Sequence, residues 1–213
     1  MKGWTRILPS SIISIIMPVC NRAAHTRKLL DKLMYCKQKY PQTEIIVVEN
    51  GSTEDMSFLE EYDITLKHCE KGVSKARNLA LDIATGDYIC FIDNDDWIPG
   101  YYLDVIYQAI KSKKDWYIWQ WYSDDTFDDM KDLDLNNPLK HQWALWGYCY
   151  RKKLFDNVRF DVNDPYGDQN INEIITPDTK GELIPLPMYR YRFLHNTDSL
   201  THIWKLTHTT SQD

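Results

Sequence analysis

Apolar residues in the first half of the chain alternate between short continuous runs and stretches with helical spacing. The runs at residues 12–17 and 44–49 are almost entirely apolar and rich in β-branched side chains. This pattern is typical of strands that are buried on both faces. Pro18 is expected to end the first strand and the turn residues 50–52 the second. Between them, apolar positions recur at helical spacing over residues 24–37, which predicts a crossover helix.

The same alternation continues along the chain. It predicts a short helix at about 54–61, a strand at 64–66, a helix at 73–84 that Gly86 ends, and a strand at 88–92. Strands and helices that alternate at this spacing predict an α/β fold, in which right-handed crossovers join the strands of a mainly parallel sheet.

Beyond residue 100 the pattern is less regular. The expected elements are a helix at 101–111, strands at 115–122 and 142–150, short helices at 151–155 and 169–175, and an extended segment at 183–193 that Pro185 and Pro187 interrupt. Six aspartates fall within residues 124–134. Like charges at this density predict a solvated loop, and a flap over a binding site is the alternative.

Length and charge limit the classes of function. With 213 residues and a mass of 25.3 kDa, the chain is expected to form one domain over residues 1–213. The net charge of -6 gives no overall attraction to nucleic acid or to an anionic membrane, although a local basic patch is still possible.

The apolar run at 12–19 is too short to span a bilayer and lacks a cleavage site, so it is not interpreted as a secretory signal. Five cysteines without close metal-ligand spacing favour reduced thiols and a cytoplasmic location.

The clearest chemical feature is an acidic cluster directly after the strand at 88–92. Asp93, Asp95 and Asp96 place three carboxylates within four residues. Ligands of parallel α/β sheets bind beyond the carboxyl ends of the strands, and crowded carboxylates need a cation. Hard oxygen ligands suit Mg²⁺ or Mn²⁺, which keep room for substrate phosphates. The cluster therefore predicts a metal-bridged diphosphate.

Four segments in the same order resemble the family 2 glycosyltransferases of the GT-A fold, which use nucleotide-diphosphate sugars. They are residues 15–22, 46–54, 72–78 and 91–97. The resemblance implies a Rossmann-like, mainly parallel half that binds the nucleotide sugar at about 11–100. It also implies a smaller mixed α/β half on the acceptor side at about 101–213, where the likeness is looser.

The resemblance implies roles for the acidic cluster. Asp95 is expected to bind Mn²⁺ or Mg²⁺ directly, with Asp93 nearer the ribose or the water shell of the metal and Asn94 between them in the nucleotide-sugar site. Asp96 is either a further ligand or the cap of the following helix. His195 is an additional candidate metal ligand.

The resemblance also implies a nucleotide site at the ends of the first two strands. Pro18, Cys20 and Asn21 stand where the family holds nucleobase and ribose, with Cys20 in place of a common aromatic residue. Glu49 and Asn50 stand where two acidic residues are usual. Because an amide both donates and accepts, Asn50 can pair with a pyrimidine edge, so UDP and dTDP sugars are the expected donors. A plain turn is the alternative role for Asn50.

Basic side chains are expected near the diphosphate. The resemblance places Arg77 close to the nucleotide, with a surface salt bridge to Asp93 as the alternative. Lys75 is a weaker candidate for the same role. Near the end of the chain, Arg190 and Arg192 lie where the predicted strand at 183–193 ends. The resemblance implies that such basic residues lie close to the diphosphate.

The resemblance implies transfer with inversion, which needs a general base for the acceptor hydroxyl. Asp168 stands at the family's base position, although Gly167 replaces its usual acidic neighbour. Capping of a helix is the alternative role of Asp168, and Asp161 and Asp164 are rival bases.

The expected function is metal-dependent transfer of a sugar to a hydroxyl of a surface glycan or polysaccharide. A hexose is the first expectation for the sugar. Trp143 and Trp146 are expected either to stack on the acceptor or to pack in the core. A lipid-linked acceptor, and with it contact with the inner face of the membrane, is a further possibility that the sequence leaves undecided. Two alternatives remain: a non-catalytic protein that binds nucleotides or glycans, and a transferase acting on a modified DNA base. The acidic balance disfavours nucleic acid as a partner.

Overall fold

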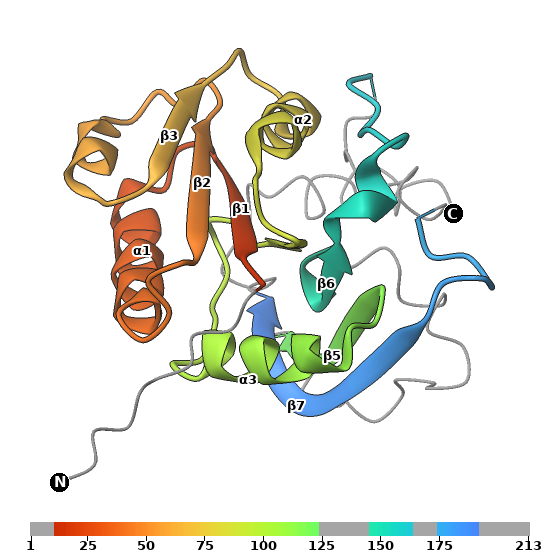
Figure 1. Cartoon of the computed structure of the whole chain (residues 1–213). Helices are drawn as coiled ribbons and strands as arrows, with labels where there is room; N and C mark the ends of the chain where they lie inside the picture. The colour runs from red at the N-terminus through yellow and green to blue at the C-terminus, as the bar shows by residue number, and fades with distance from the viewer. Residues whose placement is uncertain (1–10, 124–144, 164–173, 192–213) are drawn as a thin grey trace, which may run out of the picture.

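The structure, a computed structural model, describes residues 11–123, 145–163 and 174–191. These residues form one seven-stranded sheet with the strand order β3-β2-β1-β4-β6-β5-β7 (Figure 1). The strands are β1 Ile13–Val19, β2 Glu44–Glu49, β3 Thr65–His68, β4 Tyr88–Phe91, β5 Trp116–Ser123, β6 Tyr148–Arg151 and β7 Gly181–Tyr191. The α-helices are α1 Ala23–Lys37, α2 Val73–Ile83 and α3 Tyr102–Ala109. Short 3-10 helices are η1 Ser57–Glu61, η2 Ile110–Ser112, η5 Leu145–Gly147 and η6 Lys152–Phe155.

The sheet is mainly parallel, as predicted. Strands β3, β2, β1 and β4 are parallel neighbours, and β7 is parallel to β5. Only β6 runs against its neighbours, β4 and β5. The predicted α/β fold is therefore confirmed, and β6 gives the second half its mixed character.

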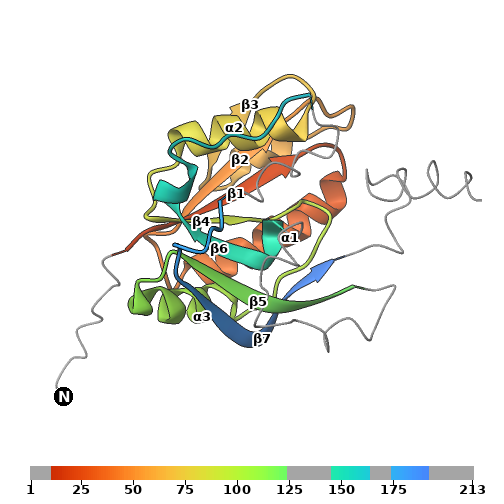
Figure 2. The same ribbon diagram turned by 90° about the vertical axis from the view of Figure 1, so that its right-hand side faces the viewer.

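Helices cover both faces of the sheet (Figures 1 and 2). On one face, Leu29, Leu30 and Leu33 of α1 and Ile106 of α3 belong to one buried apolar cluster. On the other face, α2 contributes the small side chains of its buried stripe to a second cluster with β1, β2 and β4. Every residue of β1 is buried, because the strand lies between two layers of helices. The nearly continuous apolar runs in the sequence follow from this double burial.

The prediction that Pro18 ends the first strand is wrong, because β1 continues to Val19. The backbone N–H of Ile92 donates to the carbonyl of Ile16 on the β4 side, at 3.0 Å. The N–H of Asn50 donates to the carbonyl of Val19 on the β2 side, at 2.9 Å. Directions alternate along a strand, so the nitrogen of Pro18 faces the β4 side, where pairing has already ended at Ile16. Its missing N–H therefore removes no ladder hydrogen bond.

Gly86 was expected to mark the end of α2; the helix does stop shortly before it, but its C-cap is Ala84 and not the glycine. The helix ends at Ala84 in an extended conformation, with φ -61° and ψ 132°. A Cβ atom on Gly86 would lie 2.5 Å from Oγ of Ser14. The N–H of Gly86 donates to that oxygen at 2.9 Å. Glycine is needed here because the chain passes directly against β1.

The second half differs in detail from its prediction. The strand expected at 142–150 begins only at Tyr148, after the 3-10 turn η5. Strand β7 runs through Pro185 and Pro187 without interruption, with register shifts around Gln120 of β5. Prolines are tolerated because β7 is the last strand of the sheet and has one free edge. The acidic stretch 124–134, Trp143 and most of the helix predicted at 169–175 lie outside the described residues.

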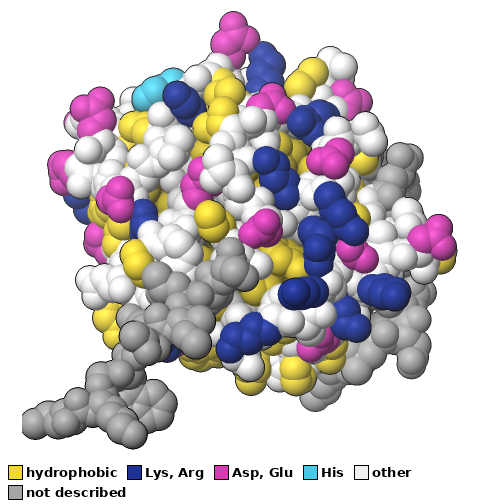
Figure 3. Space-filling view, in the orientation of Figure 1, with side chains coloured by type: hydrophobic (Ala, Val, Ile, Leu, Met, Phe, Trp, Pro, Cys, Tyr) yellow, Lys and Arg dark blue, Asp and Glu magenta, His cyan; other side chains and the backbone are white. Residues whose placement is uncertain are grey.

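Surface charge is unevenly distributed. On the face shown in Figure 3, Lys and Arg side chains gather over the right-hand half, with Asp and Glu between them. The negative net charge therefore coexists with a locally basic surface.

Within the described ranges, no helix combines the length and the apolar character that a membrane crossing requires.

Candidate functional site

The predicted site residues of the first half meet at the carboxyl edge of the sheet. Because β1, β2 and β4 are parallel neighbours, the segments that follow them lie beside one another. These segments are 20–22 after β1, 50–54 after β2 and 92–96 after β4. The acidic segment, called here the acidic turn, consists of residues 93–96.

The turn between β1 and α1 is fixed to the loop after β2. Asn21 and Arg22 both have left-handed backbones, with φ of 58° and 64°. Oδ1 of Asn21 accepts hydrogen bonds from the N–H groups of Thr53 at 2.7 Å and Glu54 at 3.2 Å. The Glu54 carboxylate in turn accepts from the N–H groups of Arg22 at 2.9 Å and Ala23 at 2.7 Å. Glu54 thereby caps α1, and the predicted nucleotide residue Asn21 has a positioning role in this structure.

Asn94 fastens the acidic turn to the turn after β1. Its amide nitrogen donates to the carbonyl of Asn21 at 3.0 Å and to Oγ1 of Thr26 at 2.8 Å. The side chain is buried, and both amide hydrogens are used. Its place in the predicted site is therefore that of an internal support.

Asp93 is held by a buried arginine. Nη2 of Arg77 donates to Oδ1 of Asp93 at 3.0 Å, and only 5% of the Arg77 side chain is exposed. The guanidinium also lies over the ring of Phe160, 5.4 Å from its centre. The alternative of a salt bridge with Asp93 is confirmed, but the guanidinium of the pair is buried, while the Asp93 side chain is 27% exposed. The Phe160 contact was not predicted, because it joins positions far apart in the sequence.

Asp95 is partly exposed, as is Asp93, whose side chain is 27% exposed. Oδ2 of Asp95 lies 3.7 Å from Nε of Arg22, and the two side chains are 20% and 23% exposed. Arg22 was not among the predicted site residues, although it directly follows Asn21 in the first motif. Both carboxylates can therefore be reached by a cation, and exposure does not separate the predicted direct ligand Asp95 from Asp93.

Asp96 points into the core instead of capping α3. It is fully buried, and its Oδ2 accepts a hydrogen bond from the Tyr189 hydroxyl at 2.9 Å. Helix α3 begins after Tyr101 without any side-chain cap, so the predicted capping role is wrong. Nε2 of His25 donates to the carbonyl oxygen of Asp96 at 3.1 Å, which requires the proton on Nε2. Asp96 therefore shapes the turn from inside.

Strand β7 holds the acidic turn from its other side. The Tyr189 hydroxyl also accepts from the N–H of Asp93 at 3.0 Å. Burial, together with the nearby charges of Asp96 and Asp93, raises the pKa of Tyr189 well above its ordinary value. The backbones of Arg190 and Trp97 exchange hydrogen bonds of 2.9 and 3.1 Å. Among the residues expected after 183, Arg190 is thus connected to the turn, while Arg192 and His195 lie outside the described residues.

Glu49 closes the end of β2. Its Oε1 accepts from the N–H of Ser52 at 2.5 Å, and its Oε2 lies 3.3 Å from Nδ1 of His68. Partial burial by itself raises the pKa of Glu49, but the hydrogen bonds from Ser52 and His68 outweigh it, and the pKa lies below its ordinary value. Glu49 is therefore ionised at neutral pH and stands at the edge where the nucleoside was predicted.

Asn50 joins three elements. Its Nδ2 donates to the carbonyl of Val19 at 2.8 Å, and its Oδ1 accepts from the N–H of Gly72 at 3.3 Å. The side chain is buried. These contacts link the ends of β1 and β2 to the start of α2. The turn alternative describes this structure better than a direct contact with the base.

Pro18 and Cys20 border the same edge. Pro18 is part of β1, and Cys20 is partly buried with its thiol 4.0 Å from the carbonyl of Gly51. Both lie next to Asn21, so all three predicted positions share one corner of the sheet.

Residues 14–169 match the family model described as Glycosyl transferase family 2. The chain belongs to this family. The predicted resemblance is therefore confirmed over most of the chain.

Two glycosyltransferases of Streptococcus pneumoniae serotype 4 are similar in sequence. GlyA is 27% identical over an alignment 225 positions long. This alignment covers 90% of this chain and 32% of GlyA. GlyG is 23% identical over 192 residues, which cover 75% of this chain and 63% of GlyG. The chain thus spans less than two thirds of the length of either relative.

Solved structures of glycosyltransferases have the same fold as this family 2 chain. TarS 1-349 of S. aureus in complex with UDP superposes with a TM-score of 0.74 at 19% identity, covering 85% of this chain and 60% of TarS 1-349. The mannosyltransferase PcManGT of Pyrobaculum calidifontis, in complex with GDP-Man and Mn²⁺, superposes with a TM-score of 0.65 at 17% identity, covering 91% and 59% of the two chains. The predicted GT-A fold is confirmed.

A divalent cation fits the carboxylates of this family 2 chain. Within the described ranges, no three His, Cys, Asp or Glu residues form a metal cage. Mg²⁺ and Mn²⁺ at nucleotide sites need only one or two carboxylates, because phosphates and water complete the coordination. Asp95, partly exposed, and Asp93, beside it, provide such a pair.

Predicted residues of the acceptor half have mixed outcomes. Trp146 is buried in the core, stacked on Tyr189 with ring centres 4.4 Å apart and set edge-on against Trp121 at 4.9 Å. The core-packing alternative is therefore confirmed for Trp146. The carboxylate of Asp161 accepts from the N–H of Asn163 at 2.9 Å within a turn. The predicted base Asp168 and its rival Asp164 lie outside the described residues.

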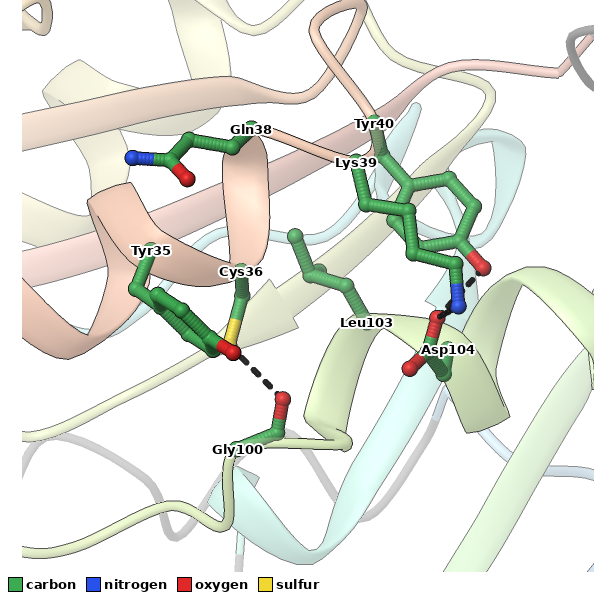
Figure 4. Close-up of a pocket in the computed structure, with 8 residues that line it drawn as sticks. All are labelled: Tyr35, Cys36, Gln38, Lys39, Tyr40, Gly100, Leu103 and Asp104. Atoms are coloured by element: carbon green, nitrogen blue, oxygen red, sulfur yellow. Dashed lines mark hydrogen bonds and ion pairs between the residues drawn. The ribbon is translucent and has the colours of Figure 1, made fainter.

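A cavity of about 420 Å³ lies away from the acidic turn (Figure 4). It is lined by Tyr35, Cys36, Gln38, Lys39, Tyr40, Gly100, Leu103 and Asp104. The Cys36 thiol donates to the carbonyl of Gly100 at 3.3 Å, and Asp104 pairs with Lys39 and Tyr40. Most of the lining belongs to the end of α1 opposite Arg22, about 20 Å along the helix axis. None of the predicted site residues lines this cavity.

Proposed function

We propose that this chain binds a nucleoside-diphosphate sugar with Mn²⁺ or Mg²⁺ and transfers the sugar to an acceptor hydroxyl. The observation that carries the proposal is the meeting of Asp93 and Asp95 with Arg77 and Arg22 at the carboxyl edge of the sheet. Two carboxylates beside two guanidinium groups suit a ligand that has both a cation and a diphosphate.

Asp95 would bind the cation directly, and Asp93, held by Arg77, would support it on the ribose side. When bound, the cation neutralises the negative charge that develops on the departing nucleoside diphosphate. Asn94 and Tyr189 hold the acidic turn in place, so the carboxylates need little rearrangement.

The nucleoside would lie along the ends of β1 and β2, near Pro18, Cys20, Asn21 and Glu49. UDP and dTDP sugars remain the proposed donors. The TarS structures are in complex with UDP or UDP-GlcNAc, and the PcManGT structure with GDP-Man and Mn²⁺. These ligands support a nucleotide sugar and a divalent cation, and they make GDP sugars a necessary part of any donor panel.

Transfer would proceed with inversion, with Asp168 taking the proton of the acceptor hydroxyl. The acceptor would be a glycan, a polysaccharide or a lipid-linked sugar, bound by the half beyond residue 100 of a single domain. An acceptor at the inner face of the membrane belongs to the same proposal.

The test combines donor binding with turnover. Calorimetry with Mn²⁺ and UDP, dTDP and GDP sugars should find at least one that binds, and release of nucleoside diphosphate should follow. Asp95→Asn should abolish the metal dependence and lower turnover roughly a hundredfold or more, because a charge at the transition state loses its partner. Asp63→Asn is the matched control, since Asp63 is exposed and pairs with Lys37 on the far end of α1.

Four results decide the proposal. No binding with any donor, or full turnover in Asp95→Asn, would sink it. Metal-dependent binding without turnover, with a varied set of glycan acceptors, would select the non-catalytic alternative. A strong salt dependence of binding to DNA would favour the DNA-base acceptor instead.

A further inference from the structure

Two arginines lie beside the acidic turn, and they are held differently. Arg77 donates a 3.0 Å hydrogen bond to Asp93 and is 5% exposed. Nε of Arg22 lies 3.7 Å from Asp95, beyond hydrogen-bond distance, and both side chains reach solvent. The difference in exposure lies in the arginines, because the two carboxylates are exposed to similar extents, 27% for Asp93 and 20% for Asp95. A buried guanidinium is less accessible to an incoming ligand than one that reaches solvent. Arg22, 23% exposed, is therefore the arginine whose guanidinium an incoming ligand reaches from solvent.

The backbone at Arg22 is strained. Both Asn21 and Arg22 have positive φ, which costs free energy in residues other than glycine. Such a conformation persists only where neighbouring contacts enforce it. Here Glu54 binds the N–H of Arg22, and Asn94 binds the carbonyl of Asn21. The strained turn holds the Arg22 side chain beside the acidic turn.

The cap of α1 does not depend on the Arg22 side chain. The start of α1 is capped by the Glu54 carboxylate, which binds the backbone N–H groups of Arg22 and Ala23. Any residue other than proline at position 22 would offer the same N–H. Because Glu54 already occupies the positive end of the helix, an incoming anion at this corner would be attracted by the Arg22 guanidinium instead.

We infer that Arg22 binds the diphosphate of the donor and, before the donor and cation arrive, balances the charge of Asp95. This inference rests on the proposed function. A cation on Asp95 repels the guanidinium, while phosphate oxygens accept its planar set of donors. Arg22 thus opposes binding of the cation alone and favours binding of the cation together with a diphosphate.

Calorimetry on Arg22→Gln tests the inference through two changes of opposite sign. Affinity for Mn²⁺ alone should rise roughly two- to fivefold, because a competing positive charge is removed. Affinity for UDP or GDP at saturating Mn²⁺ should fall roughly ten- to a hundredfold, because a charged hydrogen bond to phosphate is lost. Arg22→Lys should keep the weak Mn²⁺ affinity of the unmodified chain and recover only part of the nucleotide affinity.

The matched control is Arg27→Gln, which removes the same charge one turn further along α1. Arg27 pairs with Glu61 at 3.3 Å on the surface, so both affinities should be unchanged. Cooperative thermal unfolding of each variant shows that it is folded.

An unchanged UDP affinity in Arg22→Gln, a fall in both affinities, or no measurable gain in Mn²⁺ binding overturns the inference. These results leave the proposed function standing, provided that the unmodified chain binds a nucleoside diphosphate with Mn²⁺. If the unmodified chain binds neither UDP nor GDP with Mn²⁺, the proposed function and the inference fail together.

Discussion

The Tyr189 hydroxyl lies 2.9 Å from Oδ2 of Asp96 and connects the last described strand to the acidic turn after β4. The same oxygen accepts a hydrogen bond from the N–H of Asp93. The carboxylates that we assign to the cation are therefore positioned partly by a residue of the other half of the chain. In the proposed function, this half contributes to the donor site even where it does not touch the donor.

Tyr189→Phe should destabilise the fold and weaken donor binding. The substitution removes a donor to Asp96 and an acceptor for Asp93 in a buried place, which costs about 1–3 kcal/mol. Urea unfolding measures the loss of stability, and calorimetry with Mn²⁺ and UDP measures the affinity. Both should fall.

Tyr102→Phe is the control for Tyr189→Phe. The Tyr102 hydroxyl is buried with no nitrogen or oxygen partner among the described residues. Its removal should change the free energy of unfolding by less than about 1 kcal/mol and leave the affinity unchanged. Equal effects of the two substitutions would contradict a positioning role for Tyr189.

Asn50→Asp, which introduces the acidic residue usual in the family, should destabilise this chain. The amide of Asn50 donates to the carbonyl of Val19 at 2.8 Å, and a carboxylate would face that carbonyl without a hydrogen. The expected cost is about 1–3 kcal/mol at neutral pH. It should shrink in acid, where a protonated carboxyl regains a donor. Tighter binding of a uridine nucleotide without loss of stability would instead favour direct contact with the base.

The sequence predicted those parts of the fold that local patterns determine. Runs such as 44–49 are apolar because both faces of the strand are covered, and the stripe of α1 repeats at helical spacing for the same reason. The meeting of Asn94 with Asn21 was predictable because the ends of parallel strands share one edge.

Contacts between distant positions were not predictable in the same way. Tyr189 and Asp96 are 93 positions apart, and no local pattern indicates which side chain of β7 faces the turn. The position of the Arg22 side chain beside Asp95 depends on positive φ angles at both Asn21 and Arg22. Positive φ angles are uncommon in residues other than glycine, so the sequence did not predict this backbone. Pro18 was misread because its tolerance depends on where a neighbouring strand ends.

Trp146→Ala should cost about 3–5 kcal/mol of stability, because it empties a large site in the core. The indole stacks on the rings of both Tyr189 and Tyr191, whose centres are 4.4 and 5.5 Å from its own. Trp146→Phe should cost less, since an aromatic ring remains. Urea unfolding distinguishes the three proteins. If stability is unchanged while glycan binding is lost, Trp146 serves the acceptor and the core role is wrong.

Asp115→Asn should destabilise the fold in a pH-dependent manner. Asp115 accepts from Nζ of Lys153 at 2.7 Å and from the N–H of Lys180 at 3.0 Å, and it lies 3.6 Å from Nε of Arg151. The hydrogen bond from Lys153 is the main cause that holds the pKa of Asp115 below its ordinary value of 3.8, despite the opposing effect of burial. A carboxylate that is favoured in the folded state stabilises the fold above its unfolded pKa, and the contribution is lost as the pH falls through the folded pKa.

The penalty of Asp115→Asn, about 1–2 kcal/mol, should therefore be full at neutral pH and shrink once the pH falls below 3.8. Urea unfolding of both proteins at several pH values between neutral and strongly acidic checks this. Asp178→Asn, at an exposed position in the turn before β7, is the control and should have little effect at any of these pH values. A penalty of the same size in strong acid would mean that the charge of Asp115 does not stabilise the junction of β5, β6 and β7.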